Sequence, residues 1–151
     1  MSGCRLVQAT PDDVNVIVKL IMDMSDELQE FSPEPSIVKE SIAKSFSENV
    51  FWFLFHDDAG VPFGTCYMQS VHNYWRLEKR FYLGGFYIAP AQRGRGYFKA
   101  LNGQLLSWVK DQGGIQIYAH IHKDNQKSIQ AFQSVGMEEL DYRLYAHHWG
   151  D

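Results

Sequence analysis

The sequence has very little cysteine, with only Cys4 and Cys66 among its 151 residues. Two such cysteines offer neither a disulfide framework nor a metal-binding spacing, which favours a reducing, intracellular compartment. Long apolar runs are missing too: no stretch reaches the roughly 18 residues of a membrane span, and the first residues hold no apolar signal core. We therefore expect a cytoplasmic protein with no metal site and no membrane partner.

Positive charge is not in excess either, because the formal net charge at pH 7 is -4. Nucleic-acid binders are usually basic, so this balance argues against a nucleic-acid partner, including an RNA-binding module built on "RGRGYF". The hydrophobic content of 45% and the aromatic content of 15% are typical of a globular chain. The length is most simply that of a single domain spanning residues 1–151.

Hydrophobic periodicity and turn residues predict an order of helices and strands. Thr10 and Pro11 have the residue types of a helix start, either Asp124 or Asn125 can cap the last helix, and Gly113 and Gly136 have the residue type of helix ends. The order β-α-α-β-β-β-α-β-α-β(-β) mixes hairpins with a strand-helix-strand crossover and predicts an α+β domain with a mixed sheet. The predicted strands cover residues 4–9, 50–57, 61–71, 80–90, 115–121 and one or two segments within 137–148, and the helices cover residues 10–28, 37–46, 96–112 and 125–136.

A turn of alternating arginine and glycine follows the fourth strand, in "IAPAQRGRGYFKAL" (residues 88–101). Free N–H groups at a helix start attract anions, and glycine lets an anion approach the backbone. Arg93 and Arg95 can add charge-assisted hydrogen bonds, so the turn suits a diphosphate. The P-loop pattern is absent, and a dinucleotide fingerprint would need glycine at Lys99. A solvated turn whose arginines merely face water is the alternative interpretation.

The stretch Arg93-Gly94-Arg95-Gly96-Tyr97-Phe98 resembles the coenzyme A loop R/Q-x-x-G-x-G/A of the Gcn5-related N-acetyltransferase (GNAT) family. "NQKSIQAFQSVGM" (residues 125–137) resembles a further helix of that family, N-x-x-A-x-x-x-Y followed by G-F. The resemblance covers nearly the whole chain, and residues 67–96 look most like the branch that acetylates spermidine, spermine and related small amines. It implies the GNAT fold, a mixed, mostly antiparallel sheet of six to seven strands flanked by four helices.

The resemblance also implies acetyl-CoA (coenzyme A) as cofactor. In such enzymes the central strand splays from its neighbour, and its free backbone groups bind the pantetheine arm. The diphosphate would lie on the amides of the glycine turn. Core packing is the alternative for Phe86, Ile88 and Phe132, and Phe98 departs from the small residue of the family pattern. The implied cofactor-binding residues are Phe86, Tyr87, Ile88, Arg93, Gly94, Arg95, Gly96, Tyr97, Phe98, Asn125, Ser128 and Phe132.

The acceptor side is implied by "MDMSDELQEFSPEPS" (residues 22–36), which is acidic and contains no lysine or arginine. In this family the first two helices border the acceptor, so Asp26, Glu27 and Glu30 would attract a cationic amine. An ordinary solvated helix face is the alternative. The implied activity is direct transfer of an acetyl group, in a ternary complex, to the primary amine of a small molecule. The oligomeric state stays open, with a homodimer among the alternatives.

The usual catalytic groups of the family are missing. Relatives often place a glutamate base directly before the strand bulge and a tyrosine acid in the last helix, where this chain has Gly84 and Phe132. Three explanations stay open: another residue serves, positioning and water suffice, or the protein is a non-catalytic acyl-CoA-binding or sensor domain of the same fold. The substitute catalytic candidates are His72 and Tyr87, followed by His120 and His122.

Overall fold

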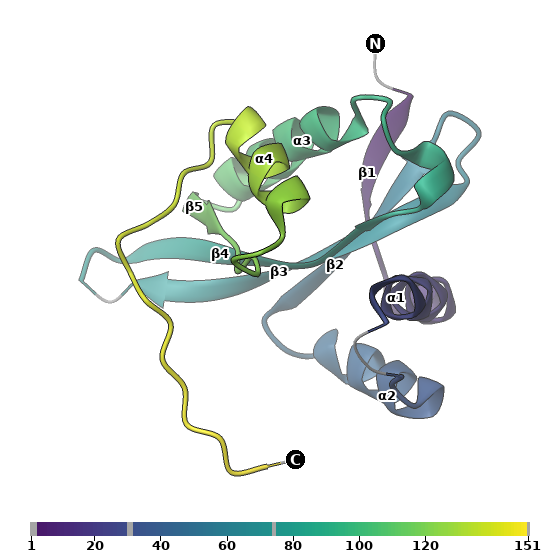
Figure 1. The fold of residues 1–151 in the computed structure, drawn as a ribbon, viewed down its shortest axis with the longest axis horizontal. Coiled ribbons are helices and arrows are strands. Elements are labelled where there is room, and N and C mark those ends of the chain that lie inside the picture. Colours follow the sequence, from purple (N-terminus) through teal and green to yellow (C-terminus); the bar gives the residue numbers. More distant parts are fainter. Residues whose placement is uncertain (1–2, 30–31, 74, 151) are drawn as a thin grey trace. The chain divides into compact units, whose positions relative to one another are not determined.

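The structure is a computed structural model that describes residues 3–29, 32–73 and 75–150. Figure 1 shows the arrangement of the helices and strands. Two short 3-10 helices, Pro11–Asp13 and Pro90–Gln92, precede α1 and the glycine turn. The helices and strands are β1 (Cys4–Gln8), α1 (Val14–Leu28), α2 (Pro35–Ser45), β2 (Val50–Asp57), β3 (Pro62–Asn73), β4 (Glu78–Ile88), α3 (Tyr97–Asp111), β5 (Gly114–Tyr118) and α4 (Gln126–Ser134).

The chain divides into two compact units, Met1–His120 and Ile121–Asp151. The first unit contains the whole sheet together with α1, α2 and α3. The second contains α4 and a segment, residues 137–150, without helix or strand. We describe each unit by itself.

The sheet of the first unit has the order β1-β2-β3-β4-β5. Its first three pairings are antiparallel, and the β4–β5 pairing is parallel. A parallel pairing needs a crossover connection, which α3 supplies between β4 and β5. The prediction of an α+β fold with a mixed, mostly antiparallel sheet and four helices is confirmed.

The predicted number of strands is wrong: among the described residues the sheet has five strands, not six or seven. The missing strands were expected within residues 137–148, where hydrophobic and polar residues alternate. That alternation marks the two faces of a possible strand but does not supply a neighbouring backbone to pair with. The apolar side chains of this segment are therefore exposed, with Tyr142 at 86% and Leu144 at 77% of their full accessibility.

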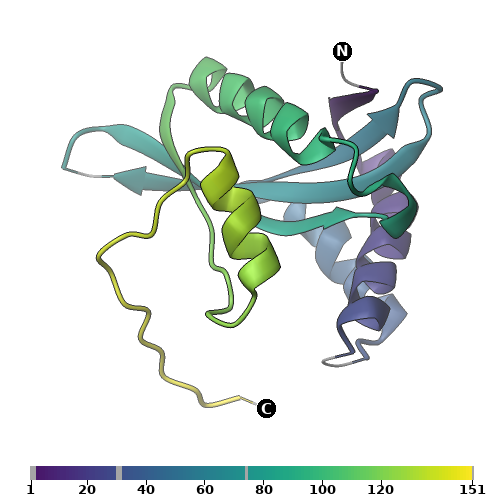
Figure 2. The same cartoon turned by 45° about the horizontal axis from the view of Figure 1, so that its top comes forward.

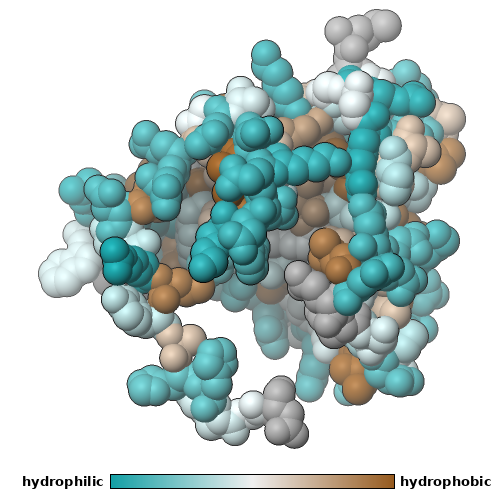
Figure 3. All heavy atoms as spheres, in the orientation of Figure 1, coloured by the Kyte–Doolittle hydropathy of each residue, from teal (hydrophilic) through white to brown (hydrophobic). Residues whose placement is uncertain are grey.

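Helices cover both faces of the sheet. Figures 1 and 2 show α1 and α2 on one face and α3 on the other. Under α3, Phe51, Phe53 and Phe81 surround Trp108 with ring-centroid distances of 5.0 to 5.3 Å. On the face seen in Figure 3, most of the visible residues are hydrophilic. The core under α1 and α2 consists of Ala9, Val14, Ile17, Leu20, Ile42, Trp52, Leu54 and Tyr87.

Candidate functional site

β4 has an open backbone edge where it extends beyond the end of β5, its parallel neighbour. The β4–β5 ladder ends at the pair Tyr82 and Tyr118, although β4 continues to Ile88. From Leu83 onward β4 has no partner on that side within the described part of the chain. Because buried backbone N–H and C=O groups need partners, this edge can bind an extended ligand. The pantetheine contacts predicted for Phe86, Tyr87 and Ile88 would use it, and they stay a prediction.

A β-bulge lies beside the open edge. The register between β3 and β4 shifts between Thr65, which faces Tyr87, and Tyr67, which faces Gly84. At the bulge, Gly85 and Phe86 of β4 lie opposite a single residue of β3. Gly85 has a φ of 58°, in the left-handed region that favours glycine. The bulge changes which face of the sheet the following side chains occupy.

Two aromatic side chains after the bulge lie on opposite faces of the sheet. Phe86 packs against Phe55 and Phe98, with ring centroids 5.0 and 5.3 Å apart. Tyr87 is 7% exposed and belongs to the core under α1. Phe98 directs its ring toward Phe86, so the Phe98 ring does not fill the glycine turn.

The glycine turn has open backbone at the start of α3. Gly94 and Gly96 each have φ of 76°, and Gly96 is the N-cap residue. The first N–H groups of a helix have no intrahelical partner, and no side chain of the described residues caps them here. A Cβ at either glycine would meet no heavy atom of the described residues within 4 Å. The backbone conformation therefore requires glycine here, and the space beside the amides is free for an anion.

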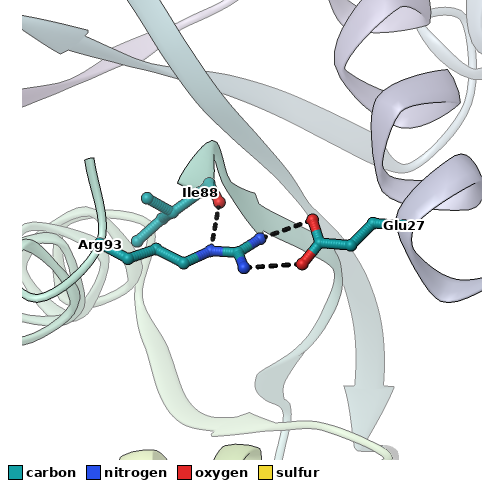
Figure 4. Close-up of polar contacts among 3 residues, drawn as sticks. All are labelled: Glu27, Ile88 and Arg93. Carbon is teal, nitrogen blue, oxygen red and sulfur yellow. Dashed lines mark hydrogen bonds and ion pairs between the residues drawn. The ribbon is translucent and has the colours of Figure 1, made fainter. Parts of the chain in front are cut away.

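The first arginine of the turn is held by α1. The Arg93 guanidinium donates to both carboxylate oxygens of Glu27 at 2.6 and 2.7 Å, and its Nε donates to the Ile88 carbonyl at 2.9 Å (Figure 4). The hydrogen bond to Glu27 is the main reason why the pKa of Arg93 is raised. Arg93 and Glu27, predicted to contact two different ligands, are thus each other's partners in the structure, and their ligand contacts stay predictions.

Among the described residues, the second arginine of the turn, Arg95, is not held by an ion pair as Arg93 is. Arg95 is exposed and forms no ion pair with any residue that the structure describes, and the same is true of Lys99 in the first turn of α3. These two side chains can contribute positive charge to an anion without breaking an existing pair. The geometry therefore favours Arg95 over Arg93 as the charged contact to a diphosphate.

The acidic face of α1 is partly neutralised. Asp23 pairs with Lys19 at 3.0 Å, whereas Asp26 is exposed and has no ion pair among the described residues. Glu30, predicted to bind substrate, lies outside the described residues.

Burial raises the pKa of Tyr87, and Glu27 and Asp23 raise it further. The Tyr87 hydroxyl is therefore a neutral phenol near pH 7, which disfavours it as a base.

The candidate bases differ in position. His72 is exposed and lies five positions along β3 from Tyr67, roughly 17 Å away, and strand alternation places it on the opposite face. The structure does not bring His72 to the bulge. His120 is exposed, and its ring lies 4.9 Å from that of Tyr82. His122 belongs to the second unit, where its Nδ1 accepts a hydrogen bond from the Asp124 N–H at 3.1 Å.

The second unit contains the remaining predicted cofactor residues. The Asn125 side-chain oxygen accepts the Ser128 N–H at 3.1 Å and so caps α4. Gly136, with φ of 88°, follows the helix as predicted. Ser128 and Phe132 are half-buried on α4. The cofactor contacts of Asn125, Ser128 and Phe132 stay predictions.

One residue beside the bulge was not anticipated from the sequence. Tyr67 faces Gly84 across the β3–β4 ladder, and its ring lies directly over that glycine. A Cβ at position 84 would come closer than 3.0 Å to the Tyr67 ring and hydroxyl. An aromatic residue covering a glycine on the next strand is a known way to fill a sheet face. The sequence contains both residues but not the register that pairs them.

The described residues hold no cluster of three or more histidine, cysteine, aspartate or glutamate side chains suited to a metal ion. Among the same residues, no helix combines the length and apolar character needed to cross a membrane.

Comparison with known proteins identifies the family. Residues 19–137 match the acetyltransferase (GNAT) family, and this match covers most of the chain and runs through both units. The chain therefore belongs to the GNAT family of acetyltransferases, for which acetyl-CoA is the typical cofactor. No curated protein sequence matches the chain.

Solved structures share the fold at low sequence identity. A possible acetyltransferase from Clostridium difficile 630 is 15% identical, with a TM-score of 0.88 over 99% of this chain and 100% of that one. A predicted acetyltransferase from Clostridium acetobutylicum, solved with acetyl-CoA, is 13% identical, with a TM-score of 0.75 over 95% and 96%. An aminoglycoside acetyltransferase from an uncultured soil metagenomic sample, in complex with sisomicin, is 15% identical, with a TM-score of 0.80 over 97% of both chains.

Proposed function

We propose that this chain, as one domain over residues 1–151, transfers the acetyl group of acetyl-CoA to a primary amine of a small cationic molecule. The observation that supports it best is the continuity of two backbone features. The open edge of β4 leads, through Pro90–Gln92, to the uncapped amides of the glycine turn. An extended arm with a diphosphate at one end fits such a track, and acetyl-CoA, the typical cofactor of the matched family, is a ligand of this kind.

The residues present fit this cofactor. The amides that follow Gly94 and Gly96 would hold the diphosphate, with Arg95 beside it. In the part of the chain that the structure describes, no heavy atom lies within 4 Å of where a Cβ of either glycine would be. The open edge of β4 would hold the pantetheine arm. Acetyl-CoA supplies a thioester-activated acetyl group, whose transfer forms an amide and a thiol and moves one proton, overall, from nitrogen to sulfur.

The contribution of the protein to the chemistry is mainly positioning and electrostatics. Free N–H groups of β4 can stabilise negative charge that develops on the acetyl oxygen. An acceptor ammonium of pKa near 10.4 is neutral in only about one molecule in a few thousand at pH 7. With Gly84 where relatives keep a base, we expect the neutral amine to be taken from solution, so that the rate follows its fraction.

Two observations support a cationic acceptor with several amines. Glu27 and Asp23 raise the pKa of Tyr87 by more than their partners Arg93 and Lys19 lower it, which supports a net negative potential on that side of β4. One structural neighbour is an aminoglycoside acetyltransferase in complex with sisomicin. Spermidine and spermine, the acceptors of the branch that the sequence most resembles, have the same chemistry of spaced ammonium groups, and we propose acceptors of this class.

The test measures thiol release with acetyl-CoA against spermidine, spermine, sisomicin and simple monoamines. We expect turnover with at least one polyamine, and thermal stabilisation by acetyl-CoA of about 2.7 kcal/mol at 100 times its dissociation constant. Tight cofactor binding without turnover on any amine would favour the sensor domain. A melting curve unchanged by millimolar acetyl-CoA would contradict both.

A further inference from the structure

We propose that the Tyr67 hydroxyl, which β3 holds over Gly84, is the side-chain group that contacts the acceptor amine beside the open edge of β4. This inference rests on the proposed function and adds a catalytic residue to it.

The two glycines of the bulge leave β4 without side chains at the point where its ladder with β5 has ended. Tyr67 covers both of them. Its ring and hydroxyl overlap the place where a Cβ of Gly84 would lie, and a Cβ at Gly85 would be 3.5 Å from Tyr67 Cδ2 and 3.7 Å from Ile21 Cδ1 on α1. A polar atom from β3 thus occupies the position from which a side chain at residue 84 would begin.

The Tyr67 ring is held from both sides. Its centroid lies 5.1 Å from that of Trp52 and 6.2 Å from that of Tyr82. Trp52 is itself fixed, because its Nε1–H donates to Ser45 Oγ at 2.8 Å. A ring packed in this way keeps its hydroxyl in one place, which is what a group that orients a substrate needs.

The Tyr67 hydroxyl has no hydrogen-bond partner among the residues that the structure describes, and its side chain is half-buried. A half-buried hydroxyl without a protein partner gains more from a ligand than one that is already paired. Its neighbours on the sheet are aromatic faces, which attract cationic ligands.

The chemistry assigned to Tyr67 is hydrogen bonding without proton abstraction. Burial raises the pKa of Tyr67, and Tyr82 raises it further, so the phenol stays protonated at neutral pH. A neutral phenol oxygen can accept an N–H of the amine and so orient the nitrogen lone pair toward the acetyl carbon. As the C–N bond forms and the C–S bond of the thioester breaks, the amine proton leaves to water, and the coenzyme A thiolate takes up a proton from water. A packing role for the ring alone is the competing explanation, and it does not need the hydroxyl.

Tyr67→Phe separates these explanations, because it removes the hydroxyl and keeps the ring. Tyr118→Phe is the matched control: it makes the same change to a half-buried ring on β5, which contacts Tyr82 at 5.5 Å and is paired with Tyr82 rather than with Gly84. The experiment uses the full chain, with kcat and KM for spermidine and sisomicin from pH 6 to 9 and calorimetric binding of acetyl-CoA.

For Tyr67→Phe we expect kcat/KM for the amine to fall about tenfold, equivalent to about 1.4 kcal/mol, at an unchanged slope against pH. Acetyl-CoA affinity should stay within about twofold of the parent, since a neutral hydrogen bond to the acceptor does not touch the cofactor. For Tyr118→Phe, kcat/KM should stay within about twofold as well.

Three outcomes would overturn the inference. Amine kinetics of Tyr67→Phe equal to those of Tyr118→Phe would leave only a packing role. A plateau of the parent profile between pH 6 and 7, whichever amine is used, would indicate a histidine base such as His120 in place of an oriented neutral amine. If the parent turns over no amine while binding acetyl-CoA, the proposed function fails, and the role of Tyr67 fails with it.

Discussion

The glycine turn before α3 and the face of β4 covered by Tyr67 belong to the same strand-to-helix region, but they are built differently. The turn offers backbone: its amides are free because Gly96 caps α3 without a side chain. The Tyr67 face offers a side chain from the neighbouring strand, placed over a glycine that has none. The first surface suits an anion, and we propose that the second contacts the acceptor amine.

The two surfaces differ in what they require of the sequence. A backbone anion site depends on conformation, so few residue types can replace its glycines. A side-chain site depends instead on which residue the register places there, and here Tyr67 of β3 faces Gly84 of β4. The missing glutamate at position 84 therefore does not by itself exclude catalysis.

The largest expected effect is on the backbone side, in Gly96→Glu. The left-handed φ of 76° disfavours a side chain, and the added carboxylate repels the diphosphate. We expect acetyl-CoA affinity, measured by calorimetry, to fall at least about 100-fold, or about 2.7 kcal/mol. Gly103→Glu, on the exposed surface of α3, is the control and should bind normally. A folded Gly96→Glu variant with the parent's affinity would show that the turn is not the diphosphate site.

Gly84→Ala tests the side-chain surface by steric overlap. The new methyl would collide with the Tyr67 ring, so we expect the free energy of unfolding in urea to fall by about 1–3 kcal/mol. Combining it with Tyr67→Ala should relieve the collision, making the double variant more stable than the sum of the single effects predicts by at least about 0.5 kcal/mol. Strict additivity of the two changes would contradict the described contact.

The two arginines of the turn are expected to act in different ways. Arg95→Ala should weaken acetyl-CoA binding about tenfold, and more at low salt, because the lost contact is charge-assisted. Arg93→Ala removes the pair with Glu27, whose side chains are 34% and 40% exposed, so unfolding should become easier by at most about 1 kcal/mol. Calorimetry and urea unfolding of both variants measure these effects. A larger loss of affinity in Arg93→Ala than in Arg95→Ala would reverse our assignment.

The smallest effect concerns alkaline stability. The pKa of Tyr67 is raised above 10.0 in the folded state. As pH rises above about 10, the Tyr67 phenol therefore ionises more readily in the unfolded chain than in the folded one, and the free energy of unfolding falls. Burial raises the pKa of Cys66 in the same direction, and Tyr82 and Tyr87 also contribute. Urea unfolding at about pH 9 and pH 11 should show a shallower fall for Tyr67→Phe than for the parent. Equal slopes would mean that the Tyr67 environment does not distinguish the two states.

Local patterns predicted most of the fold. Thr10, whose N–H donates to Asp13 Oδ2 at 2.8 Å, begins the first helical segment, and Asn125 caps α4, both at positions where residue type indicated a cap. These features depend on neighbours within a few residues, so the sequence contains the needed information. The strands expected within residues 137–148 were not found, because pairing depends on a distant backbone.

By itself, the sequence determined the order of the elements up to α4, the mixed sheet and the glycine turn, since periodicity, caps and the glycines Gly94 and Gly96 act locally. Only the tertiary structure decided which arginine is held by Glu27, a residue 66 positions away, and which ring covers Gly84. Both contacts arise from the register of β3 on β4 and the packing of α1 against the sheet. Long-range contacts of this kind result from many weak packing terms acting together, and no short stretch of residues contains them.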